Sequence, residues 1–78
     1  MTRAESRALR LVQLIALLDA HRHGLSVQDI ASHLGVSRFQ VYRDLAGLES
    51  IGFPIVCPSP GVYALMTGYR VPRILAAA

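Results

Sequence analysis

Apolar residues recur along this chain with the period of an α-helix in three separate stretches. The first stretch has apolar residues at spacings of three and four, which share one helix face: Leu11, Leu14, Ile15 and Leu18. The sequence Thr2-Arg3-Ala4-Glu5 before them has the form of a capping box, with a hydroxyl at the cap and an acid three residues on. We therefore predict a helix from about residue 2 to residue 19 or 21.

The second stretch is shorter and carries its own start and stop signals. Ser26 precedes it with an acid, Asp29, three residues later. One apolar face follows, made of Val27, Ile30, Ala31 and Leu34. Gly35 comes next, at the position where helices commonly end in a left-handed residue.

The third stretch begins directly after this glycine. Ser37 is placed to cap a helix that runs to Ser50, and Gln40 is placed to reach back to the cap. Its apolar positions repeat at i, i+4 and i+7: Val41, Leu45 and Leu48. Two short capped helices around a three-residue turn predict a helix-turn-helix, with an ordinary αα-corner as the alternative.

The opposite face of the 37–50 helix is suited to a polyanion, because it combines arginines and a π surface with two very small residues. On a helical wheel this outward face contains Phe39, Gln40, Arg43, Ala46 and Gly47, with Arg38 and Tyr42 on its flanks. If the helix lies in the major groove, Arg38 suits guanine, Gln40 suits adenine and Phe39 suits a thymine methyl. Tyr42 and Arg43 are then candidate phosphate contacts.

A β-hairpin is predicted after the third helix. Pro54 forces an extended backbone on the residue before it, and strands are expected over residues 54–57 and 62–66 around a turn at 58–61. The predicted fold is α+β and mainly helical: a winged helix-turn-helix with three helices and a C-terminal two-stranded wing over residues 1–66. The wing has no basic residue, so Tyr63 is its candidate DNA contact, and residues 67–78 form a tail.

The region from about residue 7 to residue 65 resembles the N-terminal winged helix-turn-helix of DeoR-type regulators, in the variant found in WYL-domain transcription factors. The resemblance is densest in V-S-R-x-x-V-Y-R-D-L-x-x-L-E-x-x-G-F-P-I, residues 36–55. It implies that the 37–50 helix enters the major groove and that its matching residues contact DNA: Ser37, Arg38, Tyr42 and Arg43. Ser26, which caps the preceding helix, is a further candidate contact.

In the resembled family an effector-sensing domain follows the wing. We expect this chain to act without one, as a constitutive or self-regulating repressor, and no small-molecule effector is evident. Arg3, Arg7 and Arg10 lie along one edge of the first helix and are candidate phosphate contacts, with a solvated helix edge as the alternative.

Composition agrees with one small DNA-binding domain in the cytoplasm. The net charge is +3 and every basic residue is arginine, whose forked donors suit phosphates and guanine edges. Cys57 is alone in the chain, and we expect an inert core thiol in a reducing cytosol. The apolar run 11–18 is too short to span a bilayer. No nucleophile–base set, Gly-rich phosphate loop or metal-ligand spacing is present, so we expect no enzyme activity, cofactor or metal.

A homodimer is expected, because a chain of 78 residues buries a limited core and the first helix has a second apolar face. That face, or the tail, would form the contact: Leu9, Val12, Ala16, Tyr69, Ile74 and Leu75. Coverage of the helix by its own tail is the alternative. For function, the alternative is a protein-interaction module that uses the face around Phe39.

Overall fold

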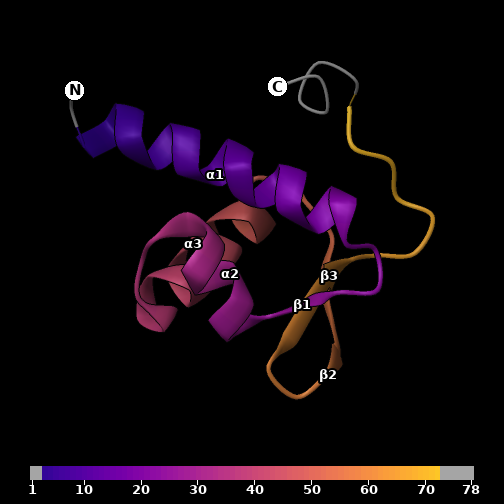
Figure 1. The fold of residues 1–78 in the computed structure, drawn as a ribbon. Coiled ribbons are helices and arrows are strands. Elements are labelled where there is room, and N and C mark those ends of the chain that lie inside the picture. Colours follow the sequence, from indigo (N-terminus) through magenta and orange to yellow (C-terminus); the bar gives the residue numbers. More distant parts are fainter. Residues whose placement is uncertain (1–2, 73–78) are drawn as a thin grey trace.

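The apolar faces of three helices and one strand meet in a single core, as the periodicity predicts. A computed structural model describes residues 3–72 of the chain, with side chains from residue 7 on (Figure 1). Its elements are α1 (Arg3–Ala20), β1 (Leu25–Ser26), α2 (Val27–Leu34), α3 (Arg38–Ser50), β2 (Ile55–Ser59) and β3 (Val62–Leu65). Every helix contributes fully buried side chains, among them Leu14, Leu18, Ile30, Val41 and Leu48.

The predicted signals shape the turn between α2 and α3. Ser26 caps α2 by accepting a hydrogen bond from the Asp29 N–H (3.0 Å), and Ser37 caps α3 by accepting one from the Gln40 N–H (3.1 Å). Gly35 has φ 68° and ψ 36°, a left-handed conformation that costs glycine little. Ala31, at the crossing of the two helices, is buried. The helix-turn-helix is therefore confirmed.

The sheet has three strands in the order β1-β3-β2, one strand more than predicted. Strand β1 has two residues, with Leu25 opposite Tyr63 and Ser26 opposite Val62. A two-residue strand is too short to show an alternating pattern, so the sequence carried no signal for it. Its pairing fixes the hairpin beside the start of α2, where the Val27 N–H also donates to the Gly61 carbonyl (2.9 Å).

Helix α1 lies across the α2–α3 pair, and the turn of the β2–β3 hairpin points away from it (Figure 1). The second apolar face of α1 remains open among the described residues, since Leu9 is 55% exposed and Ala16 is also exposed. The described part of the tail packs on the core through Tyr69 and Val71. Ile74 and Leu75, which we expected in a dimer contact, lie outside the described residues.

Candidate nucleic-acid interface

The exposed residues in the first half of α3 are the following four, and we call them the contact face: Arg38, Phe39, Tyr42 and Arg43. They face outward because Val41, Leu45 and Leu48 hold the opposite side of the helix in the core. Phe39 is 72% exposed, an unusual state for the largest apolar side chain of a helix. The contact face therefore presents two cations and two aromatic rings to the surroundings.

Arg43 and Phe39 interact within the contact face. The guanidinium carbon of Arg43 lies 5.9 Å from the centroid of the Phe39 ring, within the range of a cation–π interaction. This contact keeps a positive charge above an exposed apolar ring. Phe39 is thus part of a basic surface and not of an isolated apolar patch.

The flank of α3 that faces α1 carries polar side chains that are hydrogen-bonded to one another. Asp44 is fully buried, and Arg10 of α1 donates to it twice, from Nε to Oδ2 (2.5 Å) and from Nη2 to Oδ1 (3.1 Å). Gln40 Nε2 donates to the same Oδ1 (3.0 Å). We call these three residues the anchor cluster, because they join α3 to α1 through a buried charge.

Asp44 was not singled out from the sequence, and Gln40 was assigned to the outward face of the helix. The structure places Gln40 half-buried beside Asp44. The signal for this arrangement was weak, namely an acid four residues after a glutamine on the border of the apolar face. The bond to Asp44 uses one of the two Nε2 protons of Gln40, which leaves the other proton and Oε1 for a contact with adenine.

The three arginines predicted along one edge of α1 separate into different environments. The hydrogen bond with Asp44 raises the pKa of Arg10 above its ordinary value, and its side chain is only 20% exposed. Arg7 is exposed, and its Nη2 lies 3.1 Å from the position that a Cβ on Gly47 would occupy. The side chain of Arg3 lies outside the described part. Of the two arginines whose side chains are described, Arg10 belongs to the anchor cluster and Arg7 does not.

The hairpin supports the contact face through one aromatic pair. Tyr63 of β3 meets Tyr42 edge to face, with ring centroids 6.1 Å apart. Desolvation raises the pKa of Tyr63 above its ordinary value. Residues 55–65 contain no basic side chain. Tyr63 therefore lies beside the contact face, as a neighbour of Tyr42.

Cys57 corrects one expectation. It was predicted to be a core thiol, but it is exposed on β2, beyond the half-buried residues with which this strand begins. Its thiol donates to the Ser59 carbonyl (3.1 Å). The core assignment rested on the apolar run around Cys57, but the register of β2 against β3 is irregular between Val56 and Ser59.

The two capping serines begin adjacent helices of the motif. Each hydroxyl accepts a backbone N–H bond, which leaves its own proton available for a further acceptor. Ser37 is exposed at the start of α3, where the helix dipole also favours an anion. Ser26 is half-buried within β1, so its surroundings are less open than those of Ser37.

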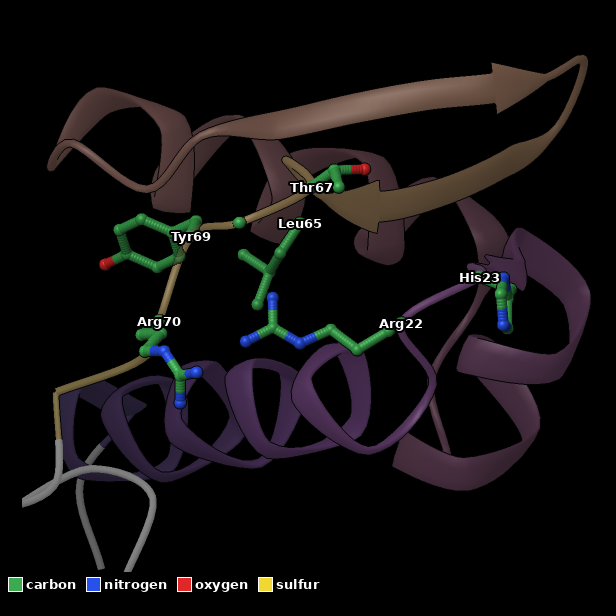
Figure 2. Close-up of a pocket in the computed structure, with 7 residues that line it drawn as sticks. Arg22, His23, Leu65, Thr67, Tyr69 and Arg70 are labelled. Atoms are coloured by element: carbon green, nitrogen blue, oxygen red, sulfur yellow. The ribbon is translucent and has the colours of Figure 1, made fainter.

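Two other arginines, Arg22 and Arg70, line a separate open pocket of about 450 Å³, to which no α3 residue contributes. Figure 2 shows Arg22 running back toward Leu65, with Tyr69 and Arg70 on the same side. Arg22 donates to Asp19 (2.8 Å). These arginines carry positive charge outside α3, so they offer charge-matched controls for the contact face.

The described residues contain no group of three or more His, Cys, Asp and Glu side chains placed to hold a metal ion. No helix within residues 3–72 has both the length and the apolar character needed to cross a membrane.

Comparison with known proteins identifies one family. The sequence model described as an HTH domain matches residues 8–70, which include every element of the helix-turn-helix and the hairpin. A search of curated proteins found no match.

Proposed function

The chain belongs to the HTH domain family, whose match indicates DNA binding and transcription regulation, and we propose that it binds duplex DNA with α3 in the major groove. The observation that carries this proposal is the division of α3 into three sides. One side is core, the second is tied to α1 by the anchor cluster, and the third is the contact face. The contact face is the exposed side of the first half of α3, and both of its charged side chains are arginines.

Within this proposal, different residues of the contact face contact bases and phosphates. Arg38, in the first turn of α3, reads guanine with its forked donors, and Phe39 packs on a thymine methyl. Tyr42 and Arg43 bind phosphates, and Ser37 adds a hydroxyl at the helix start. Gln40 bonds to Asp44 and orients α3, and its other Nε2 proton and Oε1 are left for adenine.

The test is a gel-shift titration with the DNA upstream of this protein's own gene. Arg38→Ala should lower discrimination at one base pair by about 1–3 kcal/mol. Arg43→Ala should weaken binding to all sequences. It should also reduce the salt slope, the steepness with which the logarithm of the binding constant falls with the logarithm of salt concentration, by about one. If both variants kept wild-type affinity at moderate salt, α3 would not be the DNA-binding element.

A second candidate function is a protein-interaction module that uses the same face, and the exposure of Phe39 favours it. Salt separates the two functions. DNA binding through several arginines weakens steeply as salt rises, whereas an apolar protein interface does not. The position of Arg43 over the Phe39 ring supports DNA, because a purely apolar interface would have to desolvate that charge.

We further propose a cytoplasmic repressor of the DeoR type, without enzyme activity, that acts as a homodimer. A dimer is supported by the open face of α1, where Leu9 is 55% exposed next to the half-buried Val12. Two recognition helices about 34 Å apart would read two half-sites. A reporter gene behind the chain's own promoter should be less active when the protein is present, and an increase would contradict repression.

Sedimentation tests the dimer. The chain should sediment above its monomer mass of 8.5 kDa at micromolar concentration. Leu9→Glu should return it to a folded monomer, because this side chain lies outside the core. A wild-type protein that stays at the monomer mass as its concentration rises would overturn the dimer.

A further inference from the structure

Gly47 lies in the interior of α3, although glycine is a poor helix former. Its backbone does not require glycine, because its φ is not among the positive values found in this chain. An alanine would therefore suit the helix better than the glycine does. The space beside Gly47 offers a reason for the glycine.

That space is occupied by an arginine from another helix. The Nη2 atom of Arg7 lies 3.1 Å from the position of a Cβ on Gly47, a contact tighter than most, so a side chain longer than that of alanine would have to displace the guanidinium. The ion pairs found in residues 7–72 are Arg10–Asp44 and Arg22–Asp19, and Arg7 takes part in neither. Arg7 is exposed, and its guanidinium lies beside Gly47 of α3.

Gly47 continues a row that belongs to the contact face. Phe39, Arg43 and Gly47 follow one another at i, i+4 and i+8, so they are neighbours along one ridge of the helix. Arg43 covers Phe39 at 5.9 Å. Gly47, the third residue of the row, has no side chain, and the guanidinium of Arg7 lies beside it.

We propose that Arg7 binds a backbone phosphate of duplex DNA, and that Gly47 is present in α3 to admit Arg7 to this ridge. The inference rests on the proposed function and extends it, because it adds a residue of α1 to the surface that α3 presents to DNA. A phosphate is the chemical group that fits, since it needs only a positive charge and hydrogen-bond donors at the edge of the groove. Arg10 cannot take this role while Asp44 holds it.

The experiment measures the affinity of the full chain for a mixed-sequence duplex by fluorescence anisotropy at several salt concentrations. Arg7→Ala should weaken binding on the order of three- to tenfold at low salt and reduce the salt slope by about 0.9. Arg7→Lys should keep the slope, because a phosphate accepts a point charge. Arg70→Ala is the control, an exposed arginine that lines the separate pocket, and it should leave the slope unchanged.

Gly47→Leu tests the second half of the proposal. Its side chain should displace Arg7 and weaken binding as much as Arg7→Ala does, but it should cause no further loss in a chain that already carries Arg7→Ala. Circular dichroism should show an unchanged helix content, since leucine is a better helix former. An equal loss in both backgrounds would mean that Gly47 itself approaches the DNA, which would overturn its role as the space for Arg7.

The outcomes also separate this inference from the proposed function. If Arg7→Ala keeps the wild-type slope while Arg43→Ala lowers it, α3 binds DNA and Arg7 does not. If neither variant changes the slope, the proposed function itself is wrong.

Discussion

Helix α3 and the β2–β3 hairpin lie next to each other but are built from different chemistry. Arg38 and Arg43 give α3 an exposed cationic face, and the buried charge of Asp44 ties its flank to α1. The hairpin has no basic residue between positions 55 and 65, and its buried residues, Ala64 and Leu65, are apolar. The two elements touch through Tyr42 and Tyr63.

This difference indicates that α3 and the hairpin have separate roles in the domain. Charge is concentrated on a regular helix whose orientation is held at its flank, so that its side chains have defined directions. The hairpin closes the core and supports the helix through an aromatic edge. We therefore expect α3 to respond to changes in charge and the hairpin to respond to changes in packing.

The largest effect is expected at the anchor of α3. Arg10→Met would leave the buried Asp44 carboxylate with Gln40 as its remaining side-chain donor. Removing one partner of a buried ion pair should lower the free energy of unfolding by about 3–5 kcal/mol. Urea denaturation followed by circular dichroism measures the change.

Arg7→Met is the matched control, because Arg7 occupies the same helix edge but is exposed. It should change the free energy of unfolding by less than about 0.5 kcal/mol. Equal costs for the two variants would show that the anchor cluster contributes no more than surface charge.

A smaller effect is expected where the hairpin meets α3. Tyr63→Leu removes the edge-to-face contact with Tyr42 and should lower the free energy of unfolding by about 0.5–1.5 kcal/mol. Tyr63→Phe keeps the ring and should keep both stability and DNA affinity. A loss of affinity in Tyr63→Phe equal to that in Tyr63→Leu would instead assign the hydroxyl a direct contact with DNA.

The smallest effect concerns the charge of the hairpin. Ser59→Arg places a cation next to the exposed turn, and it should raise the salt slope of DNA binding by about 0.9 if a phosphate is within reach. The gain in affinity should disappear at high salt. Ser59→Gln controls for side-chain size. An unchanged slope in Ser59→Arg would mean that the hairpin lies away from the DNA.

The sequence alone determined the parts of this protein that depend on neighbouring residues. The caps at Ser26 and Ser37, the left-handed Gly35 and the apolar faces of three helices were all predicted and are present. Each depends on a hydrogen bond or a periodic spacing within about one or two helical turns, so a local pattern contains the necessary information. The helix-turn-helix and its exposed arginines follow from these signals.

The tertiary structure decided which partners the residues on the flanks of the helices contact. A helical wheel separates the centre of an apolar face from its opposite side, but the residues on the border depend on how a second helix crosses the first. Gln40 and Gly47 are such residues: Gln40 donates to Asp44, which Arg10 of α1 holds, and Gly47 lies beside Arg7 of α1. The pairing of Arg10 with Asp44 spans 34 positions, and β1 exists only through β3.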